Sequence, residues 1–393
     1  MAEPRGIDRR DLEPKLERAF DFGARQVRAT ILRDPDFFPN YTRGGRWRHR
    51  GESWTDWCAG FHAGMMWLIA GRTGDAWWRE RAEHYSLLLE PRQHDREVHD
   101  LGFIFLNAYL PWYRSTGDDQ LRRVLITAGR TLALRFNSRG AYLRSFVAPE
   151  SLFIDIMMNV PLIFYAARET DDQDLHRLAL AHCRTTESTL VRPDGSTAHE
   201  GIFDPGTGAF LRQATHQGLR ADSTWARGLA WSLYGFGTVF TYTGGAADLS
   251  VAQRNADCFI ARSTGDLIPP WDFDVPDGPD RIVDSSAAAI AASGLWDLAS
   301  LTSPRDPARA KRYRDATLTL LLSLCDDRYL AWSTPGWEGV VKHGVYHFHK
   351  KLGVDESVMW GDFFFLEAVD KVLRDGVAGS MPTEDSIQGG LSE

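Results

Sequence analysis

Two aspartates stand out in the sequence because each lies in an otherwise apolar stretch. Asp155 is the only charged residue between Glu150 and Arg168. Asp100 precedes thirteen uncharged residues that end before Arg114. A carboxylate in apolar surroundings is costly to ionise unless it is paired or hydrogen-bonded. A pair of such acids is what general acid/base chemistry needs. The alternative interpretation is that each aspartate caps or braces the start of a helix, because Asp favours the first helical turn.

Other polar side chains occur in short motifs that precede apolar segments. Arg227 and Trp231 are four residues apart, so they share one face of a helix. An arginine beside a tryptophan suits a sugar carboxylate held next to a stacking surface; the alternative is a packed arginine in a surface ion pair. The motifs are SWTDWCAGF, REVHDLGF, PESLFID, THQGLRADSTWARGLAW, IPPWDFD, VDSSAAAIAASG, KHGVYHFHK and MWGDFFF.

The signatures of several other chemistries are missing. The sequence has no HExxH motif, no GxSxG elbow, no phosphate loop and no dinucleotide fingerprint. Because no known ligand spacing occurs, we expect no catalytic metal. The residues that could otherwise ligate one are His99, Asp100, His199, His216, His343, His347 and His349.

The elements that carry the motifs recur six times. Each repeat begins with an apolar segment rich in Gly and Ala, and most of these segments end in a turn signal such as Thr-Gly-Asp. A more amphipathic stretch follows. Six pairs of inner apolar and outer amphipathic helices predict an all-α (α/α)6 barrel rather than an open helical array. The six apolar segments are GFHAGMMWLIAGRTGD, GFIFLNAYLPWYRSTGD, NVPLIFYAARETDD, ARGLAWSLYGFGTVFTYTGG, AAAIAASGLWDLASLTSP and GDFFFLEAVDKVLR.

The barrel predicts how the chain is organised. One catalytic domain spans residues 1–375, and residues 376–393 form a loose C-terminal tail. Two Gly/Pro-rich pieces, RPDGSTAHEGIFDPGTGAF and IPPWDFDVPDGPDRIVDSS, are expected to form loops with short hairpins. Successive inner helices start on the same rim of a barrel, so the polar motifs are expected to converge on one pocket.

Composition narrows the class of protein. The 393 residues are 43% hydrophobic and 25% charged, as in soluble globular proteins. No stretch has the length of a signal-peptide core or a membrane span, and the four cysteines are scattered singly, so we expect reduced thiols in a cytoplasmic protein. The net charge of -8 argues against nucleic acid as a partner, although a few Arg and Lys could still hold one small anion.

Together the motifs resemble those of the unsaturated glucuronyl hydrolases, glycoside hydrolase family 88. The resemblance extends from about Trp54 to Glu367, and the motifs keep the family's order. HDLGF, the Asp155 segment, THQG and DSTWARG are its most specific parts, and WDFD, DSSA and WGDFF add support. It implies a barrel that removes the unsaturated uronic acid from oligosaccharides released by polysaccharide lyases, with no metal or organic cofactor. The partner would be that oligosaccharide, and the protein a monomer or homodimer.

The resemblance also implies a mechanism. Family members hydrate the C4=C5 vinyl ether of the sugar: an acid protonates C4, water adds at C5, and the hemiketal opens to release the remaining sugar. Asp155 matches the general acid/base and Asp100 a second essential aspartate. An apolar shell and a neighbouring carboxylate would raise the pKa of Asp155 above the ordinary value of about 3.9. The matches to substrate-binding residues are Trp54, His99, His199, Gln217, Arg227 and Trp231.

The chain departs from the family at two places. Phe146 stands where familiar members have tryptophan, which would weaken stacking on the sugar. In the loop after HGVY, His347, Lys350 and Lys351 replace the hydroxyls through which some members bind sulfate. The alternatives are an unsaturated rhamnogalacturonyl hydrolase, a non-catalytic barrel that binds acidic sugars, and a sugar epimerase, which would need paired histidine bases.

Overall fold

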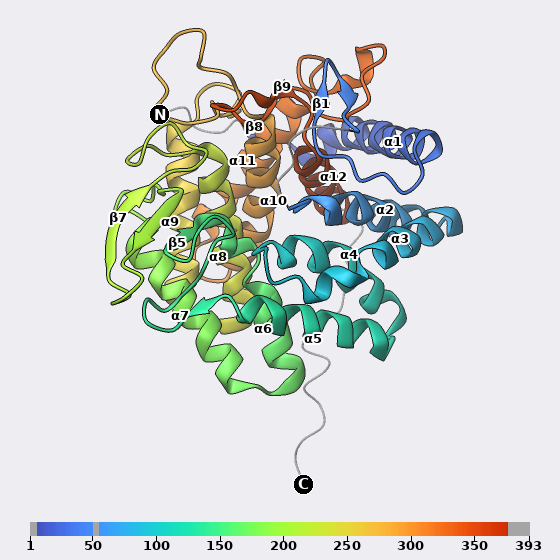
Figure 1. Cartoon of the computed structure of the whole chain (residues 1–393). Helices are drawn as coiled ribbons and strands as arrows, with labels where there is room; N and C mark the ends of the chain where they lie inside the picture. Colours follow the sequence, from blue (N-terminus) through green and yellow to red (C-terminus); the bar gives the residue numbers. More distant parts are fainter. Residues whose placement is uncertain (1–5, 50–54, 376–393) are drawn as a thin grey trace.

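Twelve helices alternate between two concentric layers in the part of the chain that the computed structural model describes, residues 6–49 and 55–375. The even-numbered helices form an inner ring in which each packs on the next and α12 closes onto α2, while the odd-numbered helices pack outside (Figure 1). The (α/α)6 barrel predicted from the sequence is confirmed. The helices are α1 (Arg9–Arg33), α2 (Ala59–Thr73), α3 (Ala76–Leu88), α4 (Leu101–Thr116), α5 (Asp119–Ala133), α6 (Pro161–Thr170), α7 (Gln173–Leu190), α8 (Ala226–Thr243), α9 (Ala246–Arg262), α10 (Ser285–Thr302), α11 (Pro307–Leu324) and α12 (Met359–Arg374).

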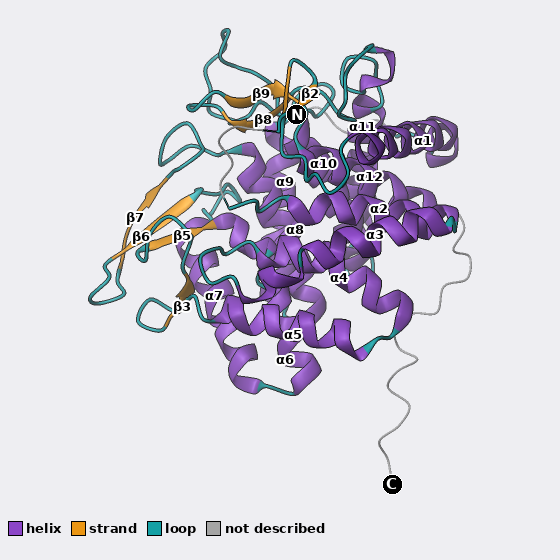
Figure 2. Ribbon diagram, turned by 45° about the vertical axis from the view of Figure 1, so that its right-hand side comes forward, coloured by secondary structure: helices purple, strands orange, loops and turns teal. Residues whose placement is uncertain are grey.

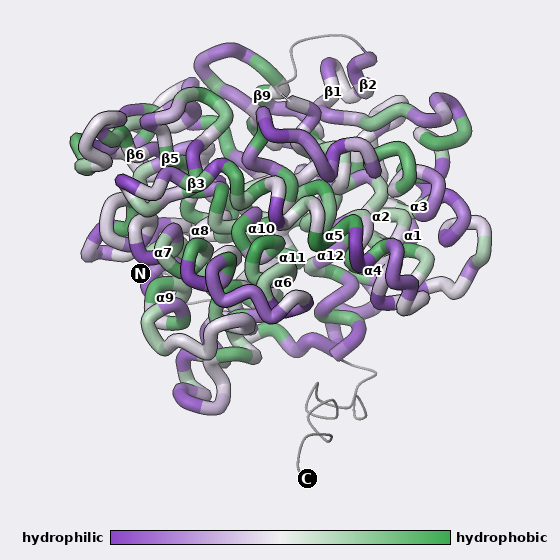
Figure 3. The backbone as a smooth tube through the Cα atoms, turned by 60° about the horizontal axis from the view of Figure 1, so that its bottom comes forward, coloured by the Kyte–Doolittle hydropathy of each residue, from purple (hydrophilic) through white to green (hydrophobic). Residues whose placement is uncertain are grey.

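The difference in hydropathy between the helices explains which of them lie in the inner layer and which in the outer layer. Fifteen of the 18 residues of α10 are buried, against five of 18 in α7, because an inner helix is covered on all sides and an outer helix on one. Figure 3 shows the hydrophobic stretches toward the centre of the molecule and the hydrophilic ones around it.

The Thr-Gly-Asp turns end one helix and start the next. Gly74 adopts a left-handed conformation (φ 68°) in which its N–H bonds to the Ala70 carbonyl, closing α2. The Asp75 side chain then accepts the Trp77 N–H at 2.9 Å and caps α3. The same pair of devices joins α4 to α5.

Small residues let neighbouring inner helices approach closely. A Cβ atom on Gly60 would lie 2.6 Å from Ile104 Cα, and one on Gly102 would lie 2.4 Å from Asn159 Cα. Because backbone atoms cannot move aside as a flexible side chain can, these glycines set the distance between α2, α4 and the segment before α6.

The sixth outer helix comes from the N-terminal segment, for which the repeats predict no helix. Helix α1 packs on α12, where its buried Gly23 lies against Leu366. Its charge-rich outer face and Pro14 obscure the apolar stripe in the sequence. The predicted tail, residues 376–393, lies outside the described residues.

Short antiparallel strands join the helices, and in Figure 2 they lie at the left (β3, β5, β6 and β7) and at the top (β2, β8 and β9) of the helical body. One three-stranded sheet has the order β5-β6-β7, and the other strands form two-stranded hairpins. Within the described ranges, no helix is long and apolar enough to span a membrane, and the four cysteines are buried and unpaired. The strands are β1 (Thr42–Arg43), β2 (Arg46–Trp47), β3 (Phe136–Asn137), β4 (Tyr142–Leu143), β5 (Ser151–Phe153), β6 (Glu200–Phe203), β7 (Phe210–Ala214), β8 (Gly344–His347) and β9 (Leu352–Glu356).

Candidate active site

The starts of several inner helices converge on one cavity, as the barrel predicted. Its walls come from the segments that precede α2, α4, α6, α8 and α12, which are far apart in the sequence. The lining residues are Trp57, His99, Asp100, Phe146, Phe153, Asp155, Gln217, Trp225, Arg227, Trp231 and Tyr346.

A histidine and the two aspartates form the polar centre of this cavity. Nε2 of His99 lies 3.1 Å from an Asp155 carboxylate oxygen and 3.3 Å from an Asp100 carboxylate oxygen. The backbone N–H of Phe146 donates to His99 Nδ1 at 3.0 Å, so the neutral ring carries its proton on Nε2 and presents it to both acids. One donor is thus shared between two carboxylates within 4.8 Å of each other.

The two aspartates that share the His99 N–H have pKa values shifted in opposite directions. Burial, together with the charge of Asp155, raises the pKa of Asp100 to about 6. Burial disfavours the charged form of Asp155, but the His99 hydrogen bond and the charges of His99 and His199 together outweigh burial, and the pKa of Asp155 is lowered. The prediction of a raised pKa for Asp155 is therefore wrong for the unliganded chain. For His99, burial lowers the pKa while Asp100 and Asp155 raise it, and the net shift is upward.

Neither aspartate acts as a helix cap. Asp100 occupies the N-cap position of α4, but its side chain accepts no hydrogen bond from that helix. Asp155 lies in the 3-10 helix η2 (Ile154–Met158), and its Oδ1 atom is buried without a hydrogen-bond partner. Asn159 joins the two segments: its Oδ1 accepts the Phe103 N–H at 2.8 Å, and its Nδ2 donates to the Asp155 carbonyl at 3.1 Å. The capping interpretation is therefore wrong.

His199 contributes a second polar group to the same centre. Its Nδ1 accepts the backbone N–H groups of His216 and Gln217, each at 3.0 Å, which places the proton of the neutral ring on Nε2. That Nε2 is buried and has no partner. Burial lowers the pKa of His199 to about 3, so the ring stays neutral and offers one free N–H donor close to Asp155.

Arg227 lies inside the protein and not in a surface ion pair. Its guanidinium donates to Gln217 Oε1 at 2.6 Å and to the carbonyls of Val345 and Tyr346, and it lies 3.6 Å from the buried Asp284. Burial lowers its pKa to about 10, which leaves it fully charged near neutral pH. The guanidinium therefore brings a fixed positive charge to the cavity wall.

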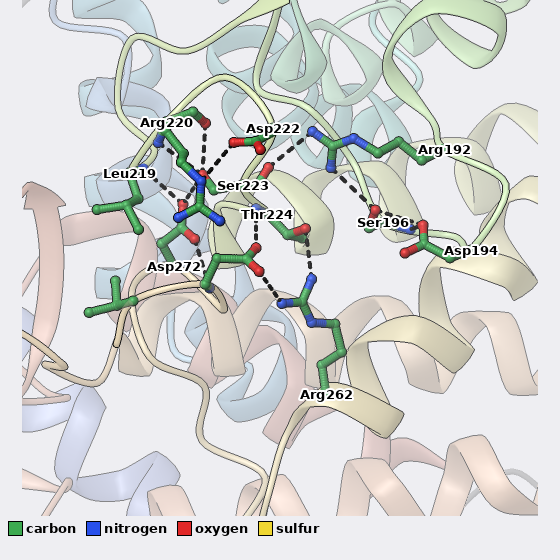
Figure 4. A network of polar contacts seen from close by, with 12 residues as sticks. Arg192, Asp194, Ser196, Leu219, Arg220, Asp222, Ser223, Thr224, Arg262 and Asp272 are labelled. Atoms are coloured by element: carbon green, nitrogen blue, oxygen red, sulfur yellow. Dashed lines mark hydrogen bonds and ion pairs between the residues drawn. The ribbon is translucent and has the colours of Figure 1, made fainter. Parts of the chain in front are cut away.

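The loop that carries Gln217 is anchored by the two aspartates of the WDFD motif, the buried Asp272 (Figure 4) and the half-buried Asp274. Asp272 accepts the Leu219 N–H at 2.8 Å and the Ser223 hydroxyl at 2.7 Å. Asp274 accepts the Thr224 N–H at 2.8 Å and pairs with Arg262. These bonds fix the path of the chain from THQG to the start of α8.

Most of the predicted site residues line the cavity, and the others lie beside it or elsewhere. Asp100, Asp155, His99, Phe146, Gln217, Arg227 and Trp231 line the cavity, and His199 lies directly beside it. Trp231 is 1% exposed and packs on Phe103, so it contributes to the floor of the cavity. His347 is buried with its ring 5.6 Å from that of His216, whereas Lys350 is exposed on the β8–β9 turn. Trp54 lies outside the described residues.

Four lining residues were missed from the sequence: Trp57, Phe153, Trp225 and Tyr346. All four belong to motifs named from the sequence, SWTDWCAGF, PESLFID, DSTWARG and KHGVYHFHK, so the signal was present. The sequence does not show that Trp57, just before α2, packs on Trp360 of α12 with ring centroids 4.7 Å apart.

Comparison with known proteins identifies the family. The sequence model of Glycosyl Hydrolase Family 88 matches residues 35–254. The chain belongs to this family. It is 36% identical to the unsaturated glucuronyl hydrolase of Bacillus sp. (strain GL1), over 88% of this chain and 93% of that protein. It is 30% identical to the unsaturated chondroitin disaccharide hydrolase of Streptococcus pneumoniae, over 82% and 83% of the two chains.

A solved structure of the family has the same fold. The crystal structure of the unsaturated glucuronyl hydrolase of Bacillus sp. GL1, an enzyme responsible for the degradation of glycosaminoglycan, matches with a TM-score of 0.85 and 32% identity, over 92% of this chain and 97% of that one. This family 88 chain is therefore a glycoside hydrolase with an (α/α)6 barrel, and the resemblance drawn from its motifs is confirmed.

Proposed function

We propose that this family 88 hydrolase removes a 4,5-unsaturated uronic acid from the non-reducing end of glycosaminoglycan oligosaccharides by hydrating the C4=C5 vinyl ether. The observation that carries the proposal is the cluster of Asp100, His99 and Asp155 at the centre of the cavity. The two relatives described above, an unsaturated glucuronyl hydrolase and an unsaturated chondroitin disaccharide hydrolase, support the same substrate class.

The cluster can supply and remove the proton that the reaction needs. Binding of an anionic sugar adds a negative charge and excludes water, and both effects raise the pKa of Asp155. The proton held by the carboxyl pair then passes from Asp155 to C4, which leaves an oxocarbenium ion at C5. The ionised Asp155 next accepts a proton from the water that attacks C5. The hemiketal opens by breaking the bond from C5 to the ring oxygen, and the hemiacetal left at C1 releases the remaining sugar.

Other side chains of the cavity bind and orient the uronate. The Nε2–H of His199 has no protein partner and is free to donate to an oxygen of the sugar. Arg227 supplies the fixed positive charge that a substrate carboxylate requires, and Gln217, bonded to it, extends the polar wall. Phe146 and Trp57 offer aromatic faces to the sugar ring.

The decisive experiment uses an unsaturated, unsulfated chondroitin disaccharide and follows the ultraviolet absorbance of its conjugated C=C bond. The wild-type protein is expected to abolish the absorbance, because hydration removes the double bond. Asp155→Asn, which keeps the size of the side chain but has no proton to exchange, is expected to lower kcat by more than about 1,000-fold with an unchanged melting temperature. Wild-type turnover in the variant would exclude Asp155 as the acid/base.

Two controls separate this function from its alternatives. One histidine and two carboxylates could also hold a divalent cation, so the assay is repeated with a chelator; a proton-transfer mechanism predicts unchanged rates. An unsaturated rhamnogalacturonan disaccharide tests the pectin alternative. Binding of chondroitin, hyaluronan and heparin fragments without loss of absorbance would instead identify a non-catalytic sugar-binding barrel.

We further propose that the protein acts in the cytoplasm as a monomer or homodimer. The four buried, unpaired thiols support a reducing compartment. Light scattering on the purified chain tests the oligomeric state.

A further inference from the structure

A second concave surface lies next to the candidate active site and is lined by arginines. It is a cleft of about 560 Å³ whose walls come from the segment before α4, the end of α5 and the residues around β4 and β5. Arg96, Arg135 and Arg144 line it, and Glu97 is the only acidic lining residue among those described. The whole chain carries a net charge of -8, so a cleft with three cations and one anion is distinct from the rest of the surface.

The cleft is organised by Arg135, which is 8% exposed. Its Nε donates to the Arg144 carbonyl at 2.9 Å, one Nη donates to the Ser145 carbonyl at 2.5 Å, and the other bonds the Arg96 carbonyl. Three bonds to carbonyls tie the two walls together, and no carboxylate of the described residues lies within ion-pair distance of Arg135. The nearby carboxylates of Asp100, Glu97 and Asp95 stabilise this charge only from a distance, so its field still reaches the adjoining space.

The other two guanidinium groups are available to a ligand. The Nε of Arg144 donates to the Arg135 carbonyl at 3.1 Å, and its two Nη atoms, like the whole Arg96 side chain, make no hydrogen bond to any residue that the structure describes. Neither forms an ion pair with any residue that the structure describes, Glu97 included. Planar Arg groups of this kind bind sulfate and carboxylate bidentately.

The position of the cleft connects it with the reaction site. Phe146 lines both the cleft and the active-site cavity, so an oligosaccharide that passes over Phe146 reaches the arginines. Leu134 and Val147 lie at the cleft and are 56% and 43% exposed, which provides apolar surface for the faces of sugar rings. A charged saccharide has apolar ring faces and anionic groups. The exposed apolar side chains can contact the ring faces, and the arginines can bind the anionic groups.

We infer that this arginine cleft is a subsite for a negatively charged group, a sulfate ester or a uronate carboxylate, on the part of the oligosaccharide that leaves. The inference rests on the proposed function, and it names a determinant of specificity separate from the β8–β9 turn. Arg96 and Arg144 contact the anion, and Arg135 positions the two walls.

The test compares three substrates in one absorbance assay: an unsulfated unsaturated chondroitin disaccharide, its sulfated form, and an unsulfated tetrasaccharide with an internal uronate. For each of the other two substrates, kcat/KM is divided by the value for the unsulfated disaccharide, which lacks the additional anionic group. In the double variant Arg96→Gln/Arg144→Gln, this ratio is expected to fall about ten-fold, because KM rises for the substrate whose additional group the arginines bind. Loss with the sulfated disaccharide identifies sulfate as the ligand, and loss with the tetrasaccharide identifies the carboxylate. Arg135 is left intact because its bonds hold the walls together.

Arg123→Gln is the matched control, since Arg123 lies on the same helix α5 but is 66% exposed and outside the cleft. It is expected to leave both ratios unchanged. Calorimetric titration of the sulfated disaccharide and of the tetrasaccharide into Asp155→Asn, with and without the two arginine substitutions, measures binding without turnover, and the substrate that shows the kinetic loss should show the same ten-fold difference. Unchanged ratios in the double variant overturn the inference while the proposed function stands. A wild-type protein that hydrates none of the substrates overturns both.

Discussion

At the residue scale, the chemistry of the site depends on the linked ionisation of Asp100, His99 and Asp155. Each group alters the ionisation of the other two, because all three lie within 4.8 Å of one another and are largely buried. The acid whose pKa is raised, Asp100, is not the acid whose Oδ1 is buried without a hydrogen-bond partner, Asp155.

This arrangement predicts the pH dependence of the reaction. A carboxyl group with a raised pKa must be protonated to act as an acid, so activity is lost as the pH rises through about 6, the pKa of Asp100. The slope should approach about a ten-fold loss of kcat/KM per pH unit. In Asp100→Asn the loss should begin at lower pH, because the pKa of the remaining Asp155 is lowered by His99. A pH–rate profile identical in both proteins would contradict this assignment.

The same raised pKa predicts how stability depends on pH. The folded protein binds more protons than the unfolded chain between the ordinary Asp value of 3.8 and about 6, so this group lowers the free energy of unfolding as the pH rises through that window. Asp100→Asn removes the buried charge. Chemical denaturation at pH 5 and pH 8 should therefore show a smaller fall in stability for the variant than for the wild type, and an equal fall would disprove the linkage.

At the scale of elements, the distance between α4 and the Asp155 segment determines whether the two acids can share His99. Gly102 sets that distance, since a Cβ there would lie 2.4 Å from Asn159 Cα and 2.7 Å from its carbonyl oxygen. His99 and Asp100 directly precede α4, so a displaced helix moves them away from Asp155.

Gly102→Ala is therefore expected to lower kcat on the order of 100-fold, because a shift of about 1 Å in a reacting group has that effect. Backbone overpacking should also destabilise the protein by about 1–3 kcal/mol. Gly237→Ala is the matched control: Gly237 is also on an inner helix, but its Cβ would meet nothing within 4 Å. The control should retain full activity and gain some helix stability. Equal effects of both substitutions would reject the role given to Gly102.

At the scale of the whole molecule, a charged network joins three inner helices away from the active-site rim. The ammonium group of Lys371 on α12 donates to Tyr234 Oη of α8 at 2.6 Å, and to Ser293 Oγ and Asp297 of α10 at 2.9 and 2.6 Å. Glu367 completes the network at 3.4 Å from the ammonium. Such ties across the ring hold the barrel closed.

Lys371→Met should lower the free energy of unfolding by roughly 2 kcal/mol, because it leaves Asp297 and Glu367 without their cation in a partly exposed setting. Since the active-site motifs lie at the opposite ends of these helices, kcat should change less than about two-fold. Lys311→Met on the outer helix α11 removes the ion pair between Lys311, which is 70% exposed, and Asp315, and should cost at most about 0.5 kcal/mol. Urea denaturation and the absorbance assay check both values; a large loss of kcat in Lys371→Met would show that the ring and the site are coupled.

The sequence by itself determined the features of this protein that depend on neighbouring residues. Apolar segments and Thr-Gly-Asp turns define the inner helices and their caps, since periodicity and left-handed glycines act over a few residues. The six repeats then predict the barrel, and the rim position of the motifs predicts that Asp100, Asp155, Gln217 and Arg227 meet. N-terminal helix α1 escaped prediction because its charges conceal its apolar face.

Only the tertiary structure decided what depends on contacts between distant segments. Asp155 was expected to hold a proton in its apolar segment, but His99, 56 residues earlier, bonds its carboxylate and lowers its pKa. Likewise Arg96, Arg135 and Arg144 belong to three separate segments, and their meeting in one cleft is invisible in a chain of net negative charge. Ionisation and field depend on the distances between charges in space, and folding sets those distances.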